Sequence, residues 1–206
     1  FGISIPMEKL SDNNMHNYFY VYAPDYYVWC LDINIICYLT NEIDGVLTED
    51  DAVEIAELTT ASCVVLQDFG PEVVDNYRDM CIKQTQKYVG KNRDEVVYDL
   101  LSNCWTWDNY SLSIMFIRTL TLLFPNKDTR NKMVTLFLEL LFKNINPDPS
   151  KRLSIKETQQ FFEDIFFTDD IVTGFEGLAQ TISNDKQITV SRFEQDIHHL
   201  KLPTNK

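Results

Sequence analysis

Acidic residues gather around an Asp-Gly pair in TNEIDGVLTEDD, residues 40–51, and this combination could bind calcium. An EF-hand loop has glycine at its sixth position, aspartate at its first and a bidentate glutamate at its twelfth. With Gly45 sixth, Thr40 stands first and Asp51 twelfth, so neither position has its usual ligand. A similar stretch at 183–197 fails because a lysine stands at its glycine position. We interpret these acids as a solvated face and assign no metal site.

No residue set is typical of nucleophilic catalysis or of a zinc site. His198 and His199 lie in a polar tail, where we interpret them as solvated, and six glycines form no phosphate-binding loop. No C-x-x-C pair exists, so we predict neither a disulfide framework nor a zinc site, and we expect a reducing, intracellular location. The five cysteines are Cys30, Cys37, Cys63, Cys81 and Cys104.

Arg152, a long and positively charged residue, stands at a predicted junction between two helices in NINPDPSKRLSIKETQQFF, residues 144–162. The two prolines of this segment stop any helix that arrives from upstream. Ser154 and Glu157 form a capping box, which predicts a helix that begins directly after Ser154. Arg152 therefore lies on a short rigid connection between two helices, and its guanidinium needs an acidic partner.

Helices are the elements that must position these residues, so the predicted fold class is mainly α. An aromatic segment leads into an apolar run that predicts a buried helix near 31–39. Caps, prolines and apolar periodicity predict the other helices. One helix should begin after Thr48, and another should begin at Pro71 and end at Gly90. The remaining helices are expected at about 92–104, at 131–145, directly after Ser154 and at about 192–200.

Composition predicts a globular domain and excludes some partners. The chain has 206 residues, is 45% hydrophobic and has a formal net charge of −13. A protein that coats nucleic acid is disfavoured because phosphate binding needs clustered Lys and Arg. The apolar runs are too short or too broken to span a bilayer, and no signal peptide begins the chain. The first residue is not Met, so we expect part of a longer polypeptide.

One further segment, WTWDNYSLS at residues 105–113, opens an apolar helix with Asp108 as its expected N-cap. It resembles the central buried helix of the C-terminal lobe of eukaryotic-type protein kinases, which begins D-x-W/Y-S-L-G. Asp108, Tyr110, Ser111 and Leu112 match that signature, and Ser113 replaces the glycine. In the family this aspartate holds the backbone of the catalytic loop.

The DPSKR segment resembles the next landmark of that family, an Asp-Pro pair followed by an Arg before the last helix. Arg152 follows Asp108 by 44 residues, which leaves room for two connecting helices. In kinases this Arg pairs with the acid of an Ala-Pro-Glu motif. The chain offers Ala23, Pro24 and Asp25, so the resemblance implies Asp25 as the partner of Arg152. An alternative places that acid at Asp32.

The first residues, FGISIP, resemble an Asp-Phe-Gly motif without its Asp, so Phe1 and Gly2 would border the metal site of a kinase. Residues 1–25 would then be the activation segment. Ser4, Ser11 and Tyr18 could be phosphorylated there, but no basic cluster lies beside them, and we interpret them as unmodified loop residues.

The chain also departs from the family. Between Asp25 and Asp108 lie 82 residues where ordinary kinases have a short link, which implies a helical insertion at 40–104. The letters DFG at 68–70 fall in it and run into Pro71, so we interpret them as coincidence. The enlarged lobe is similar to protein kinases of large DNA viruses. The resemblance covers 1–167 and leaves 168–206 as an extension.

The resemblance implies a function for a larger whole. That whole would transfer the γ-phosphate of ATP to protein substrates, with Ser/Thr favoured over Tyr, and ATP and Mg²⁺ would be its cofactors. The nucleotide-binding lobe and catalytic loop are not in this chain, so we name no catalytic residue and expect no activity from it alone. Those missing residues and protein substrates would be its partners.

Two other hypotheses stay open. One is a non-catalytic, pseudokinase-like scaffold, a virion component or another assembly protein, retained for its binding surfaces. If the protein is viral, its intracellular location would be the host cytoplasm or a virion. The other is a helical interaction domain with accidental motifs, in which Arg152 would be exposed and far from Asp25.

Overall fold

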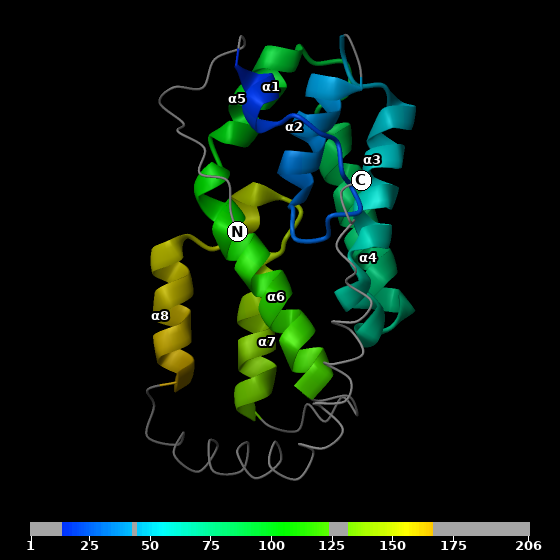
Figure 1. Cartoon of the computed structure of the whole chain (residues 1–206). Coiled ribbons are helices and arrows are strands. Elements are labelled where there is room, and N and C mark those ends of the chain that lie inside the picture. The colour runs from blue at the N-terminus through cyan, green and yellow to red at the C-terminus, as the bar shows by residue number, and fades with distance from the viewer. Residues whose placement is uncertain (1–13, 43–44, 124–131, 167–206) are drawn as a thin grey trace, which may run out of the picture.

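The structure is a computed structural model, and it describes residues 14–42, 45–123 and 132–166. Within these ranges the chain is helical and has no strand, as the predicted fold class requires (Figure 1). None of the helices in these ranges is long and apolar enough to cross a bilayer. The elements are α1 (Met15–Tyr18), α2 (Leu31–Asn41), α3 (Glu49–Ser62), η2 (Val64–Phe69), α4 (Pro71–Gln86), α5 (Arg93–Leu101), η3 (Cys104–Thr106), α6 (Trp107–Leu123), α7 (Lys132–Asn144), η4 (Pro149–Lys151) and α8 (Ile155–Phe166).

Helix α2 is the buried centre of the described part. Nine of its eleven residues are buried, from Leu31 through Thr40 with Ile33 excepted. A helix that is apolar around most of its circumference gains most free energy when other helices cover every side, and α1, α3 and α5 pack against it. The expected buried helix at 31–39 is confirmed.

Local sequence signals explain the start of each surrounding helix. Thr48 and Asp51 form a capping box at α3, and Asn92 caps α5 by accepting from the backbone N–H of Asp94. Pro71 is the first residue of α4. That helix ends at Gln86, four residues before Gly90, which has a φ of +71° in the turn that follows. The expected helix at 192–200 lies outside the described residues.

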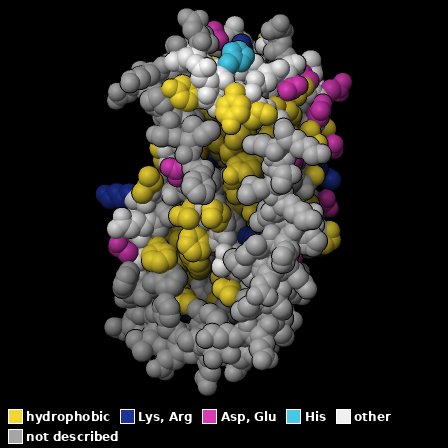
Figure 2. All heavy atoms as spheres, in the orientation of Figure 1, with side chains coloured by type: hydrophobic (Ala, Val, Ile, Leu, Met, Phe, Trp, Pro, Cys, Tyr) yellow, Lys and Arg dark blue, Asp and Glu magenta, His cyan; other side chains and the backbone are white. Residues whose placement is uncertain are grey.

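Helices α3 and α4 pack side by side at the right of Figure 1, and α6, α7 and α8 pack in succession to their left. The helices of the expected insertion at 40–104 do not stand apart, because their buried residues belong to the same apolar cluster as those of α2, α6 and α7. Exposed acids line α3, as Figure 2 shows along that edge. Among them, Glu49, Asp50, Glu54 and Glu57 agree with the interpretation of a solvated face.

Candidate functional site: a buried arginine–aspartate network

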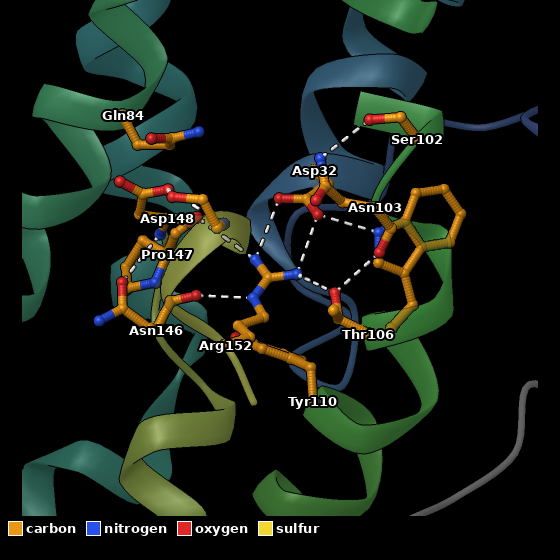
Figure 3. Close-up of polar contacts among 12 residues, drawn as sticks. Asp32, Gln84, Ser102, Asn103, Thr106, Tyr110, Asn146, Pro147, Asp148 and Arg152 are labelled. Carbon is orange, nitrogen blue, oxygen red and sulfur yellow. Dashed lines mark hydrogen bonds and ion pairs between the residues drawn. The ribbon is translucent and has the colours of Figure 1, made fainter. Parts of the chain in front are cut away.

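Arg152 and Asp32 form a two-pronged ion pair in the interior (Figure 3). Nη1 of Arg152 lies 2.9 Å from Oδ2 of Asp32, and Nη2 lies 3.0 Å from Oδ1. Both side chains have 0% exposure. This parallel arrangement is the strongest geometry available to a guanidinium and a carboxylate. It joins the connection before α8 to the first turn of α2, 120 residues earlier.

The other N–H groups of Arg152 are also occupied. Nε donates to the backbone oxygen of Asn146 at 2.7 Å, Nη1 donates to Oγ1 of Thr106 at 3.1 Å, and Nη2 donates to the oxygen of Pro147 at 3.3 Å. With the two bonds to Asp32, all five N–H donors of the guanidinium have an acceptor. A buried charge needs such full pairing to offset the loss of its hydration.

The sequence places these acceptors by local rules. Pro147 and Pro149 keep the connection out of the helical conformation, so the carbonyls of Asn146 and Pro147 are available to Arg152. Asp148 accepts from the N–H of Ser150 and caps the short η4 turn. Arg152 follows directly as the residue at the end of that turn. The capping box of Ser154 and Glu157 then begins α8 as predicted.

Aromatic residues of α6 surround the pair. Trp107 donates from its indole Nε1 to Oδ2 of Asp32 at 2.9 Å. The guanidinium carbon of Arg152 lies 5.3 Å from the centre of the Tyr110 ring, a distance at which a cation is attracted to an aromatic face. The Tyr110 hydroxyl lies 2.9 Å from that of Tyr77 on α4. The network therefore connects α2, α4, α6 and the turn before α8.

Burial and charge act in opposite directions on Arg152. Burial is the largest single effect and would lower its pKa, but the charge and hydrogen bonds of Asp32, together with Cys30 and Tyr110, outweigh it and raise the pKa above its usual value. Burial also raises the pKa of Tyr77 and Tyr110 well above their ordinary values. These groups keep one protonation state across the physiological range. The arrangement is suited to fastening helices together, and it has no exposed group to act on a substrate.

The expected pairing of Arg152 with Asp25 is wrong, and the alternative partner, Asp32, is confirmed. Asp25 is exposed in a turn closed by a bond from the Tyr26 N–H to the Ala23 oxygen. Asp32 instead begins a fully buried helix, where an unpaired carboxylate would be costly. The accidental-motif hypothesis required Arg152 to be exposed and far from Asp25; Arg152 is buried, and its partner is Asp32 in place of Asp25.

The expected role of Asp108 as the N-cap of a central buried helix is also wrong. The turn η3 leads directly into α6 at Trp107, so Asp108 is the second residue of the helix, and its side chain is exposed. Helix α6 itself is only partly buried, with Leu112 and Met115 on its outer side. The buried central helix of the described part is α2.

Phe1 and Gly2, with Ser4 and Ser11, lie outside the described residues. Asp68, in the coincidental DFG, lies in η2 just before α4, and one of its oxygens is 4.0 Å from Arg118. Asp51, the twelfth residue of the rejected calcium loop, accepts hydrogen bonds from Tyr38 and Thr48. Within the described ranges, no group of three or more His, Cys, Asp or Glu side chains is arranged to hold a metal ion.

Sequence reasoning missed the contributions of Thr106, Trp107 and Tyr110. A signal did exist for Asp32, because an acid within the apolar run WCLDINIICYL needs a buried partner. Trp107, the first residue of α6, offered no comparable signal, since an indole N–H gives no indication of its acceptor in the sequence.

Comparison of the chain with protein-family models, with curated proteins and with solved structures found no match.

Proposed function

We propose that this chain is the helical C-terminal-lobe part of a protein kinase-type protein, the part that supports and presents the substrate side of the catalytic cleft. The whole protein would transfer the γ-phosphate of ATP to protein substrates, with Mg²⁺ as cofactor. The groups that perform this transfer would be contributed by residues other than those described here.

The buried pair of Arg152 and Asp32 carries the proposal. In the resemblance, an Arg that follows an Asp-Pro pair reaches back to an acid near the end of the activation segment. Arg152 follows Asp148 and Pro149, and it binds an acid seven residues beyond Asp25. Like the pair in the family, this pair joins an Arg that follows an Asp-Pro pair to an acid earlier in the chain, and both side chains are buried. Asp32 takes the role first predicted for Asp25.

The position of α2 gives a second line of support. A kinase C-lobe is organised around one buried helix, and α2 is the buried helix at the centre of the described part. If α2 is the central helix, then α3, α4 and α5 come after it in the chain. They are then no insertion between the activation segment and the central helix. The 82 residues between Asp25 and Asp108 then contain the central helix α2 itself and helices that pack around it.

The coding sequence directly upstream of Phe1 tests this proposal. It should encode an Asp immediately before Phe1 and, further upstream, a catalytic loop with a His/Tyr-x-Asp motif and a downstream Asn. An upstream sequence without these residues would reject the catalytic assignment and favour the pseudokinase-like scaffold.

A phosphate-transfer assay of the longer protein tests the same proposal biochemically. The protein that includes the upstream residues, incubated with radiolabelled ATP, Mg²⁺ and a general acceptor protein, should transfer labelled phosphate. Replacing the Asp before Phe1 with Asn should abolish the transfer because that side chain holds the metal. Equal labelling by both proteins would show a contaminating kinase, and no labelling by either would refute the enzymatic function.

A further inference from the structure

Helix α6 is apolar on two opposite sides. Its inner side includes the buried Ile114 and Ile117, and α7, η2 and η3 are the elements that pack most closely on the helix. On its outer side Leu112, Met115 and Phe116 are 52%, 55% and 42% exposed. Figure 2 shows hydrophobic side chains gathered in the region where Figure 1 draws α6. Single exposed apolar residues are common, but neighbouring ones on one helical face mark a surface that binds another apolar surface.

The exposed residues of α6 have the spacing that fits one further helix. Asp108, Leu112, Met115 and Thr119 are all exposed and stand at i, i+4, i+7 and i+11. Alternate steps of four and three residues are the a and d positions of a coiled-coil heptad, with Leu112 and Thr119 at a and Asp108 and Met115 at d. A second helix can therefore contact all four side chains along one line. We call these four residues the α6 seam.

The α6 seam is complementary to itself when two copies of the helix run antiparallel. In that arrangement each a position faces a d position of the other helix. Leu112 then faces Met115 of the second copy, and Asp108 faces Thr119 of the second copy. Because a two-fold axis repeats every contact, the apolar pair and the polar pair each occur twice. The charged residue of the seam thus meets its one hydroxyl, and apolar residues meet apolar residues.

Charge selects the antiparallel direction. A parallel pair would place the two Asp108 carboxylates opposite each other, which is unfavourable between like charges. In the single chain the Thr119 hydroxyl donates to the Met115 backbone oxygen at 2.9 Å. Rotation of the Thr119 side chain in the antiparallel pair replaces that bond with one to a carboxylate, and hydrogen bonds to charged acceptors are the stronger kind.

We infer that two copies of this chain bind each other through antiparallel α6 seams, with the two-fold axis between Leu112 and Met115. One helix pair is a small interface, so the dissociation constant should be about 10–100 µM. Each copy has a net charge of −13, and the copies repel each other over the distance that salt leaves unscreened. Added salt should therefore strengthen the dimer.

Sedimentation velocity of the full 206-residue chain, from about 1 to about 500 µM, measures the dissociation constant. Leu112→Asp should weaken the dimer by about a hundredfold or more because it buries a charge at two places in the interface. Leu58→Asp makes the same change at another exposed leucine, on α3, and should leave the dissociation constant unchanged. Circular dichroism checks that both variants fold.

A second set of variants tests the direction of the helices. Thr119→Arg places a cation opposite Asp108 twice and should tighten the dimer by about threefold to tenfold. Asn76→Arg adds the same charge on the exposed side of α4 and should change the dissociation constant by less than about twofold. The gain from Thr119→Arg should disappear when Asp108→Asn is present as well.

The inference is overturned if the chain stays monomeric at every concentration and at high salt. It is also overturned if Leu112→Asp and Leu58→Asp weaken self-association equally, which would place the contact elsewhere. A gain from Thr119→Arg that persists with Asp108→Asn would reject the antiparallel seam. If Leu112→Asp fails to fold, the Thr119 variants still decide, because unfolding cannot produce a tighter dimer.

Discussion

Removing Arg152 should destabilise the protein more than almost any other single polar substitution. Arg152→Ala would leave the Asp32 carboxylate buried, with the Trp107 indole as its remaining side-chain donor in the network, and would strip the Asn146 and Pro147 oxygens of a partner. Removing one partner of a buried ion pair of this kind lowers the free energy of unfolding by about 3–5 kcal/mol. For a domain of this size, 1 kcal/mol shifts the melting temperature by about 2–4 °C. We therefore expect a decrease of about 6–20 °C.

Neighbouring residues provide matched controls. Lys151 is 65% exposed and lies 3.9 Å from Asp148, so Lys151→Ala should change the free energy of unfolding by less than about 0.5 kcal/mol. Asp25→Asn should also have little effect because Asp25 is exposed. Arg152→Lys keeps the charge but not the fork that binds both carboxylate oxygens, so its cost should fall between those of Lys151→Ala and Arg152→Ala.

Urea unfolding followed by far-ultraviolet circular dichroism measures these differences, and differential scanning calorimetry gives the melting temperatures. Equal and small effects of Arg152→Ala and Lys151→Ala would refute the buried network. A cost for Asp25→Asn as large as that for Asp32→Asn would refute the choice of partner.

Four further predictions concern the network and its surroundings. Trp107→Phe should cost about 1–3 kcal/mol in urea unfolding because the Asp32 carboxylate loses a buried donor. Thr48→Ala should cost about 1 kcal/mol, measured in the same way, because α3 loses its cap. Burial would raise the pKa of Asp51, but hydrogen bonds from Tyr38 and Thr48 outweigh it and lower the pKa below 3.8. The stability from Asp51 should therefore be complete above the ordinary pKa of an aspartate and lost as the pH falls through the lowered pKa, and an acid titration of Asp51→Asn should lack that loss. Cys104, which is partly exposed, should react first with a thiol reagent at pH 8 in the folded protein, and the remaining cysteines should react only after unfolding. Burial is the largest effect on the pKa of these four thiols and raises it to about 12 in Cys30, Cys37, Cys63 and Cys81.

Local signals in the sequence predicted the helices well. Capping boxes at Thr48 and Ser154 and the proline at position 71 specify helix starts through groups within three residues of one another. The apolar periodicity of 131–145 predicts α7, which runs from Lys132 to Asn144. These features depend on neighbouring residues alone, so the sequence contains all the information that they need.

The partner of Arg152 depended on long-range geometry. Two acids, Asp25 and Asp32, stood at suitable distances along the chain, and the family resemblance favoured the first. The decision depends on where the buried helix begins, because its first turn holds Asp32 in the interior and leaves Asp25 in an exposed turn. The apolar residues around Asp32 were the better guide, since they indicate burial and burial requires a counter-charge.

The wrong prediction that Asp108 is the N-cap of the central helix also arose from long-range packing. An acid before an apolar helix is a good N-cap candidate, yet η3 starts at Cys104, four residues before Asp108, and α6 then begins at Trp107. Trp107 then reaches Asp32, 75 residues away. Which helix occupies the centre is settled by the packing of all helices together, and nine of the eleven residues of α2 are buried, against five of the seventeen of α6.

A double-mutant cycle between Asp32→Asn and Arg152→Gln, measured by urea unfolding, tests most directly whether this pair fastens the fold. The account predicts that the double variant is more stable than the sum of the single changes allows, by about 2 kcal/mol or more. A coupling energy within about 0.5 kcal/mol of zero would show that the two side chains act independently. That result would contradict the buried pair and the kinase-type proposal that depends on it.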